Sequence, residues 1–443
     1  MKSQHQATTE IWSPFETTSW EQLQNRVVRP LIKKQLASVL KRSPFYQKKL
    51  GGHRPKKGLI LADLPHLPFT EKHELVEDEQ KHPPFGSYLA APTGQIMRVH
   101  RTSGTSALPL LLALSKKDIE QTVECGARCF WASGLRPQDM AVHCLNYCLW
   151  SGGLTDHQSL ERTGAAVIPY GVGNSSNLIR TILALRPTAI HCTPSYLAKL
   201  QTLLEREFSI TPRSLGLRLG LFGGEGGLQS RDFRKHIESV WGFRAMDANY
   251  GAADVLSMFG AECKVRNGLH FMGQGVILPE LKDPKSDTIL VWEKGVRGEF
   301  VFTSLRKECQ PLIRYRSHDI VEVVGIDRCA CGRRSPRFRI VGRLEDMIVV
   351  RGVNVFISSI AACINQHLDQ LSGEFRVRVD REDPIERCII AVETRADNPG
   401  SELIRQLEDG FRQSLYFKPA VELLEPGSLP RTEGKTQRLE RIL

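Results

Sequence analysis

Short apolar segments alternate with helix-like segments through the middle of the chain, and this alternation restricts the possible fold more than any other feature. Four segments read as short buried strands: residues 140–145, 165–169, 189–192 and 217–222. Amphipathic stretches between and after them predict helices over residues 175–185, 195–207 and 230–241. Such an order implies a parallel sheet covered by helices on both faces. Functional residues are then expected beyond the carboxyl ends of the strands.

The pattern changes twice further along the chain. Beyond Gly260, residues 288–293 and 299–304, joined through Gly295 and Gly298, predict a β-hairpin. After residue 342 the sequence reads as a smaller unit of two strands, a helix and another strand. We therefore expect an α/β protein with a large domain over residues 1–342, built on parallel-rich sheets, and a small α+β domain over residues 343–443.

Composition limits the class of protein. The 443 residues are 41% hydrophobic and 25% charged, as in globular proteins, and neither a secretory signal nor a bilayer-spanning apolar run is evident. We therefore expect a cytoplasmic protein without a membrane partner. The net charge of +11 suits nucleic acid or small polyanions such as ATP and coenzyme A. Aromatic residues are sparse among the arginines of residues 328–351, which disfavours a nucleic-acid partner. A solvated basic face explains any single arginine there equally well.

A loop rich in hydroxyls and glycine, residues 99–110, is the first sign of nucleotide chemistry. The backbone of such a loop can curve around a polyphosphate so that its N–H groups donate hydrogen bonds to the phosphates. Five consecutive residues could do so: Thr102, Ser103, Gly104, Thr105 and Ser106. An ordinary turn has the same composition, so the loop alone is a weak signal.

Further segments follow in order and together with this loop form a set. They are Phe222-Gly223-Gly224-Glu225, Asn249-Tyr250-Gly251, Ile313-Arg314-Tyr315-Arg316-Ser317-His318-Asp319, Gly342-Arg343 and Pro430-Arg431-Thr432-Glu433-Gly434-Lys435. This set resembles the motifs of the adenylate-forming enzymes, most of all the phenylacetate-CoA ligase branch. Phe69-Thr70-x-Lys72, Ser151-Gly152-Gly153-Leu154 and Thr193-Pro194-Ser195-Tyr196 are further marks of that branch. The resemblance extends over nearly the whole chain.

The resemblance implies a site for ATP and AMP. Asp319 would accept hydrogen bonds from both ribose hydroxyls, and Arg343 would add a donor. Tyr250 would offer a flat face to adenine, with Gly223 and Gly224 letting the backbone approach the base. The same set includes Glu225, Asn249, Gly251 and the loop from Thr102 to Ser106.

The resemblance also implies a mobile C-terminal domain. Lys435 would neutralise charge on the reacting phosphate and carboxylate oxygens during adenylation. The domain would then swing about Glu345 and Asp346, so that Arg351 and Gly352 line the tunnel for coenzyme A.

Two departures from the family pattern concern the phosphates. Ser106-Ala107-Leu108-Pro109 stands where the family usually has Thr-Gly-Lys-Pro. Loss of that lysine costs ~1.5 to 3 kcal/mol of ATP binding if its contact is a charged hydrogen bond. Asp254 stands where the family carries a glutamate for Mg²⁺, and aspartate is a shorter oxygen ligand. A degenerate member that binds nucleotide without catalysis therefore remains an alternative.

The acid would lie among flat and apolar side chains. By position these are Tyr147, Trp150, Ser151, Gly152 and Phe222, with Lys72 near the carboxylate. They suit a small aromatic acid, although Trp150 and Phe222 equally suit a protein core.

Cysteine spacing predicts a second site. Cys329-x-Cys331-Gly332 is a close thiolate pair on a turn, and Cys263 and His270 offer two more ligands. Three sulfurs and an imidazole complete a tetrahedral zinc shell, so the ion would be structural, although unrelated thiols explain the same spacing.

The sequence therefore predicts an ATP-dependent aryl-CoA ligase that uses Mg²⁺ and coenzyme A, with a homodimer as a possible assembly. The nearest alternative adenylates an acid but passes the acyl group to an amine or to a carrier-protein thiol.

Overall fold

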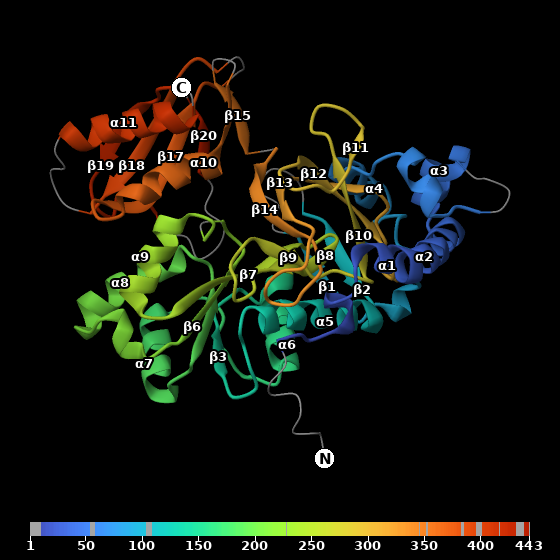
Figure 1. The fold of residues 1–443 in the computed structure, drawn as a ribbon, viewed down its shortest axis with the longest axis horizontal. Helices are drawn as coiled ribbons and strands as arrows, with labels where there is room; N and C mark the ends of the chain where they lie inside the picture. The colour runs from blue at the N-terminus through green and yellow to red at the C-terminus, as the bar shows by residue number, and fades with distance from the viewer. Residues whose placement is uncertain are drawn as a thin grey trace. The chain divides into compact units, whose positions relative to one another are not determined.

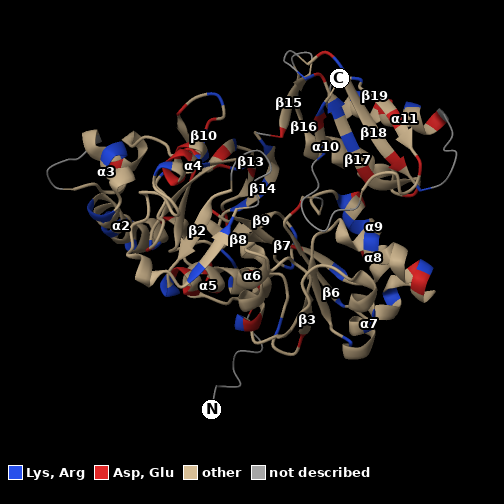
Figure 2. Cartoon of the chain, turned by 180° about the vertical axis from the view of Figure 1, so that it is seen from behind, with Lys and Arg blue, Asp and Glu red and all other residues tan. Residues whose placement is uncertain are grey.

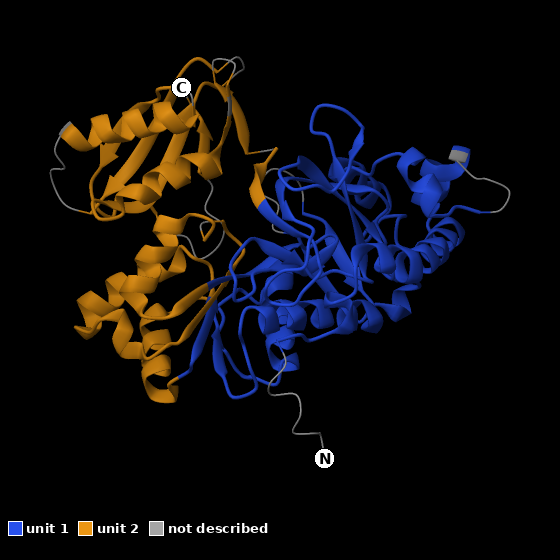
Figure 3. Cartoon of the chain, in the orientation of Figure 1, with its two compact units in different colours: residues 1–171, 187–191, 246–339 blue, residues 172–186, 192–245, 340–443 orange. Residues whose placement is uncertain are grey.

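The computed structural model describes residues 10–53, 58–102, 109–226, 228–344, 346–350, 353–381, 385–395, 401–415, 417–430 and 438–442 (Figure 1). The chain divides into two compact units (Figure 3). Unit 1 comprises residues 1–171, 187–191 and 246–339, and unit 2 comprises residues 172–186, 192–245 and 340–443. The predicted boundary at residue 342 falls close to the last junction between the units, and the two-domain division itself stays a prediction.

Unit 1 begins with a series of helices. They are η2 (Pro14–Glu16), α1 (Trp20–Leu23), η3 (Gln24–Val28), α2 (Arg29–Arg42), α3 (Pro44–Leu50), η4 (Gly51–His53), η5 (Leu61–His66), α4 (Lys72–Lys81) and η6 (Thr93–Gln95). The chain turns between α2 and α3 because Ser43 is extended and Pro44 cannot continue the preceding helix. The Ser43 hydroxyl accepts a hydrogen bond from the N–H of Tyr46 and so caps α3.

A hairpin and two long helices follow. Strands β1 (Arg98–Arg101) and β2 (Leu111–Leu114) pair antiparallel, and α5 (Lys116–Ala132) and α6 (Ser151–Arg162) pack against each other and against β8 (Figure 1). Ser115 and Asp118 form a capping box at the start of α5. Gly126 allows the close approach of the two helices, since a Cβ there would lie 2.2 Å from Ser159 Oγ.

Three of the four predicted strands pair in parallel. Strand β3 (Met140–His143) pairs in parallel with both β4 (Ala166–Pro169) and β5 (Ala189–Cys192). The remaining strands follow the order β11-β10-β12-β13-β14-β9-β8-β7. They are β7 (Arg244–Ala252), β8 (Leu256–Ala261), β9 (Leu269–Phe271), β10 (Ile277–Lys282), β11 (Ile289–Leu290), β12 (Arg297–Ser304), β13 (Tyr315–Gly325) and β14 (Arg337–Arg343).

The predicted hairpin of residues 288–304 is wrong. Strand β11 pairs with β10, where Leu290 lies opposite Leu281, and β12 pairs with β10 and β13. Two glycines close together suggested a direct turn, but β12 is buried from Gly298 to Ser304 and takes a long partner on each side. Burial on a sheet outweighed the local turn signal.

Unit 2 contains α7 (Ser175–Leu185), α8 (Tyr196–Leu203), η7 (Leu204–Phe208), η8 (Pro212–Leu215), β6 (Leu219–Gly223) and α9 (Arg231–Trp241). Its C-terminal part adds β15 (Met347–Val350), β16 (Val353–Phe356), α10 (Ile357–Ile364), η9 (Asn365–His367), β17 (Leu371–Val379), β18 (Cys388–Thr394), α11 (Ser401–Leu415), β19 (Ala420–Leu424) and β20 (Leu439–Arg441). The last four strands form a sheet in the order β19-β18-β17-β20, and α10 and α11 pack on it. The predicted unit of two strands, a helix and a strand is thus present, and the prediction missed β15, β16, α10 and β20.

Basic residues are distributed over both units, as Figure 2 shows. Two arginines of the basic stretch are not part of a solvated face. Arg333 is fully buried in an ion pair with Glu16, and Arg337 is 5% exposed and paired with Asp327. Among the described residues, no helix combines the length and the apolar character needed to cross a membrane.

Candidate active site

Tyr250 and Asp319, which the sequence assigns to the nucleotide, are in contact in unit 1. The Tyr250 hydroxyl on β7 donates to Asp319 Oδ2 on β13 over 2.7 Å. Edge-on contacts with Phe259 and Phe338, at 5.2 and 5.5 Å between ring centroids, fix the plane of the tyrosine ring. Asp319 is only 3% exposed, and its backbone N–H donates to Ser317 Oγ. Two motif segments far apart in sequence therefore build one rigid polar edge.

Asp254, the predicted Mg²⁺ ligand, is held at both ends. The Tyr315 hydroxyl donates a short hydrogen bond to its carboxylate. The Lys307 ammonium donates to its backbone carbonyl over 2.6 Å, and burial lowers the pKa of Lys307. The carboxylate is thus a preset oxygen ligand of the kind that Mg²⁺ prefers.

Sequence reasoning missed a group of charged side chains beside Asp319. Arg316 donates to both carboxylate oxygens of Glu299, at 2.7 to 3.1 Å, and to Glu71 over 2.6 Å. His318 Nε2 lies 2.9 Å from Glu71 Oε2. His318 has a left-handed backbone, with φ of 60°, which is uncommon for a residue other than glycine.

This charged group connects two predicted regions of the site. Glu71 lies directly before α4, whose first residue is Lys72, while His318 precedes Asp319. Hydrogen bonding to Glu71 raises the pKa of His318, and the partners His318 and Arg316 lower the pKa of Glu71 to about 2 although burial opposes the shift. The signal in the sequence was the histidine inside the Arg-Tyr-Arg-Ser-His-Asp segment, but nothing local points to Glu71.

The start of α6 carries several residues predicted for the acid. Trp150 occupies the N-cap position, and Ser151 and Gly152 are buried in the first turn. Gly153 lies so close to the preceding loop that a Cβ would be 2.2 Å from the Asn146 carbonyl. Tyr147 on that loop has its hydroxyl 3.0 Å from His157 Nδ1. Ser257 on β8 donates to Ser151 Oγ over 3.2 Å.

Beneath this turn lies a chain of buried polar side chains. His143 Nε2 is 2.8 Å from the Gly153 carbonyl, and His143 Nδ1 is 2.9 Å from His191 Nδ1. His191 Nε2 is 4.0 Å from Asp156, which accepts a short hydrogen bond from the Asn249 amide. Burial lowers the pKa of His143 to about 4 and raises the pKa of Asp156. The chain is therefore a neutral support between the start of α6 and β7, and the predicted role of Asn249 toward the nucleotide stays a prediction.

Other predicted nucleotide and acid residues belong to unit 2. Phe222, at 1% exposure, packs 5.8 Å from Phe243 in the core, and Gly223 ends β6. Gly224 has a φ of 80°, a conformation that glycine adopts readily. Glu225 accepts a hydrogen bond from the Ser195 N–H over 3.4 Å, and burial raises its pKa. The placement of these residues next to Tyr250 stays a prediction.

The remaining predicted residues lie at the ends of described segments or outside them. Thr102 is buried, and its hydroxyl accepts a hydrogen bond from the Leu110 N–H at the base of the β1–β2 hairpin. Arg343 is half-buried at the end of β14, and Asp346 is exposed. The predicted residues outside the described part of the chain are Ser103, Gly104, Thr105, Ser106, Glu345, Arg351, Gly352 and Lys435.

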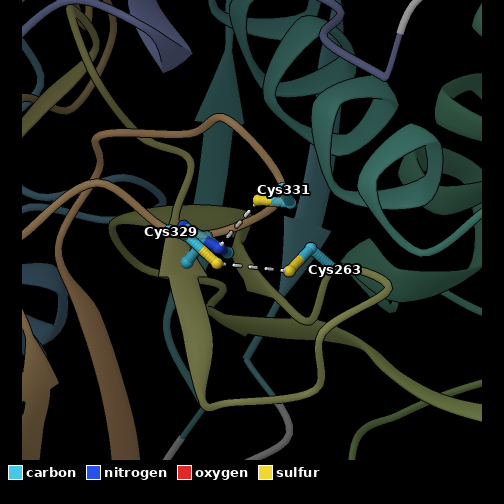
Figure 4. Close-up of side chains that lie close together, drawn as sticks. Cys263, Cys329 and Cys331 are labelled. Carbon is cyan, nitrogen blue, oxygen red and sulfur yellow. Dashed lines mark hydrogen bonds between the residues drawn. The ribbon is translucent and has the colours of Figure 1, made fainter.

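The four predicted metal ligands converge in unit 1. One ligand atom from each of Cys263, His270, Cys329 and Cys331 lies within 4.8 Å of the others. Figure 4 shows the three sulfur atoms directed toward a common point, with Cys263 Sγ 3.9 Å from Cys329 Sγ. His270 Nε2 is 3.5 Å from Cys331 Sγ, while its Nδ1 lies 3.0 Å from Ser335 Oγ, the kind of outer contact that orients a metal-ligating imidazole.

The donor set fits zinc. All four residues are at most 6% exposed, so no position is open to solvent or substrate. Three thiols and one imidazole match the soft, tetrahedral preference of Zn²⁺. The predicted grouping of the residues is confirmed, and the identity of the ion stays a prediction.

Comparison with known proteins identifies the family to which the chain belongs. Residues 352–440 match the model of the AMP-binding enzyme C-terminal domain. The chain is 32% identical over 437 residues to phenylacetate-coenzyme A ligase of Thermus thermophilus, covering 93% of this chain and 94% of that protein. It is also 32% identical over 436 residues to phenylacetate-coenzyme A ligase of Escherichia coli, covering 96% of each.

A solved structure shows the same fold. The similar structure is that of 2-hydroxyisobutyryl-CoA ligase in the postadenylation state in complex with R3-HIB-AMP, with 28% identity and a TM-score of 0.90. The match covers 99% of this chain and 94% of that one. The chain belongs to the phenylacetate-CoA ligase branch of the adenylate-forming enzymes, the AMP-forming ligases that join a carboxylic acid to coenzyme A.

Proposed function

We propose that this protein activates a small aromatic carboxylic acid with ATP and transfers the acyl group to coenzyme A. In the first step a carboxylate oxygen attacks the α-phosphorus of ATP, giving an acyl-adenylate and releasing pyrophosphate. In the second step the thiol of coenzyme A attacks the acyl carbon, AMP leaves, and the thiol proton is released. The contact between Tyr250 and Asp319 carries the proposal, because it unites two motif segments assigned to one nucleotide.

Each proposed role follows from the chemistry of the residue. The two oxygens of Asp319 accept the ribose hydroxyls, and the ring of Tyr250 supports adenine. Arg343 adds a donor to the ribose or the phosphates, and Thr102 begins the loop that holds the outer phosphates. Lys435 supplies positive charge to the oxygens on which negative charge grows during the attack.

The carboxylate of Asp254 is a suitable ligand for Mg²⁺. Asp254 supplies the carboxylate oxygen, already oriented by Tyr315 and Lys307. The ion would neutralise phosphate charge when bound. The role of the surrounding residues is to hold that oxygen in place.

The acid is proposed to lie at the start of α6, beside Tyr147, Trp150 and Ser151. The ring of Tyr147 is fixed by its contact with His157 and by an edge-on contact with His143, at 5.4 Å between ring centroids. Rigid aromatic walls favour a flat acyl group over a flexible chain. Lys72, one residue from Glu71, would support the carboxylate of the acid.

The Cys/His cluster of Cys263, His270, Cys329 and Cys331 is proposed to hold a structural zinc ion. The ion would join the β8–β9 connection to the turn before β14, which lies next to the Arg333–Glu16 ion pair. Elemental analysis of the purified protein should find about one zinc per chain if the donor set is filled.

Release of pyrophosphate tests the proposal. The full-length protein is supplied with ATP, Mg²⁺ and one aromatic acid at a time, with and without coenzyme A, and acyl-CoA is measured by mass spectrometry. We expect acid-dependent pyrophosphate and an acyl-CoA product only when coenzyme A is present. Pyrophosphate without consumption of coenzyme A would favour transfer to an amine or carrier protein. No pyrophosphate across the acids would favour a nucleotide-binding protein without catalysis.

A further inference from the structure

A cavity in unit 1 lies next to the segment that carries Asp254. The volume of the cavity is ≈ 30 Å³, which is enough for about two or three water molecules. Its lining includes Ala253 and Val255, the neighbours of Asp254, and Ser151 at the start of α6. The cavity thus shares its walls with the two segments proposed to handle the metal and the acid.

One wall of the cavity carries hydroxyl groups. Ser151 and Thr155 come from the first two turns of α6, and Ser257 comes from β8. Ser257 donates to Ser151 over 3.2 Å, and Thr155 Oγ1 is 3.5 Å from His100 Nε2. Burial lowers the pKa of His100 to about 4, so its imidazole is neutral and has a lone pair to share.

The cavity has unused hydrogen-bonding capacity. Gln121 Oε1 is buried and has no hydrogen-bond partner among the described residues. The Lys307 ammonium has three N–H groups and makes hydrogen bonds to two carbonyls, those of Asp254 and Val255. Because unpaired buried polar groups are costly, this space favours an occupant that donates and accepts hydrogen bonds.

Aliphatic side chains form another part of the lining. They are the side chains of Leu112, Leu256, Val276 and Ile277. A cavity that takes benzene is about 150 Å³, so a whole aromatic ring does not fit here. The space suits a hydroxyl group together with the carbon that carries it.

We infer that this cavity binds the hydroxyl substituent of a hydroxylated carboxylic acid, and that Ser151, Thr155 and Ser257 select such acids over their unsubstituted counterparts. The inference rests on the proposed function and narrows its substrate class. A site that hydrogen-bonds a substrate hydroxyl discriminates strongly against an analogue without it, because the buried polar groups then lose their partner.

Matched pairs of acids test the inference in the pyrophosphate assay of the full-length protein. The pairs are phenylacetate with its three ring-hydroxylated isomers, benzoate with its hydroxylated isomers, and isobutyrate with 2-hydroxyisobutyrate. We expect at least one hydroxylated acid to exceed its parent about 100-fold in kcat/KM. If acids release pyrophosphate but no hydroxylated member exceeds its parent, the cavity holds only water, and the inference fails while the proposed function stands. If no acid releases pyrophosphate, the proposed function fails and this inference fails with it.

Two variants assign the preference to the cavity. Thr155→Val and Ser257→Ala should each lower the ratio of hydroxylated to parent acid about 10-fold, because each removes one hydrogen bond to the substituent. The control is Ser159→Ala on the same helix, whose buried hydroxyl donates to the Thr155 carbonyl and does not line the cavity. Its ratio should equal that of the unaltered protein. An unchanged ratio in folded Thr155→Val and Ser257→Ala, or an equal fall in all three variants, would overturn the inference.

Discussion

Two polar clusters of unit 1 are built from different chemistry. The Cys/His cluster is closed, with all four ligand residues at most 6% exposed. The second group, called the open cluster here, is defined by its proposed role at the nucleotide and comprises Tyr250, Asp254, His318 and Asp319; it is partly open, and the His318 side chain is 23% exposed. Soft ligands that complete a shell hold a structural ion, whereas hard oxygen ligands with open positions serve substrates. This difference in chemistry supports the proposal that the closed cluster stabilises unit 1 and that the open cluster serves the reaction.

The largest expected effect concerns the closed cluster. Cys331→Ser should abolish zinc binding and remove about 4 kcal/mol of stability. An ion whose free concentration is about 1,000 times its Kd stabilises the folded state by this amount. Thermal unfolding and elemental analysis measure both effects. Cys148→Ser, which alters an exposed cysteine outside the cluster, serves as the control. Equal stability of Cys331→Ser and the control, together with no zinc in the unaltered protein, would contradict the structural role.

A substitution in the open cluster should slow the reaction without changing zinc binding or stability. Asp254→Asn should slow pyrophosphate release about 100-fold, because it removes the charge that faces the metal. Zinc content and the thermal midpoint should not change, and supplied acyl-adenylate should still react with coenzyme A. The control is Asp327→Asn, which alters an exposed carboxylate paired with Arg337. Equal loss in both half-reactions would indicate damage to the fold rather than to the metal ligand.

The missing loop lysine gives a gain-of-function test. Leu108→Lys places a cation at the family position and should strengthen ATP binding about 10-fold, as expected for one charged hydrogen bond. The KM for ATP in pyrophosphate release measures it, with Leu108→Gln as the uncharged control. An equal KM in both variants would show that the open cluster binds phosphate without help from this position.

The smallest effect is a pH dependence at His318. Its pKa is raised by Glu71 and Glu299, so the ion pairs stabilise the fold fully below the unfolded value of about 6.5 and are lost as the pH rises through the higher folded value. The stability difference between the protein and His318→Gln should therefore shrink as the pH rises from 6 to 9. It should not exceed about 1 kcal/mol, as for other partly exposed pairs. Denaturant unfolding at several pH values measures it, and a difference that grows with pH would be the wrong sign.

The sequence predicted those parts of the molecule in which local pattern and spacing carry the signal. The strands at residues 140–145 and 189–192 and the helix at 175–185 follow from burial periodicity, and α7 spans Ser175–Leu185 as expected. Cysteine and histidine spacing identified all four residues of the closed cluster. These predictions succeeded because periodic apolar residues, and cysteine and histidine at such spacing, have few alternative roles when they are buried.

Contacts between distant segments were not predictable in the same way. Glu71 lies 245 residues from Arg316, and the isolated backbone bridge between Thr70 and Tyr315 brings them together. The hairpin at residues 288–304 failed because β10 competes for both strands, which a local turn signal cannot reveal. His191 looked like part of a buried strand, and its contact with His143 depends on the parallel register of β3 and β5.

Oxygen-18 transfer is the most direct test of the central claim, that the protein forms an acyl-adenylate. The acid found in the pyrophosphate assay is labelled with oxygen-18 in its carboxylate and converted with ATP and coenzyme A, and the nucleotide product is analysed by mass spectrometry. An acyl-adenylate leaves one labelled oxygen on the phosphate of AMP, so singly labelled AMP is the predicted product. Unlabelled AMP, or ADP with labelled inorganic phosphate, would contradict the account.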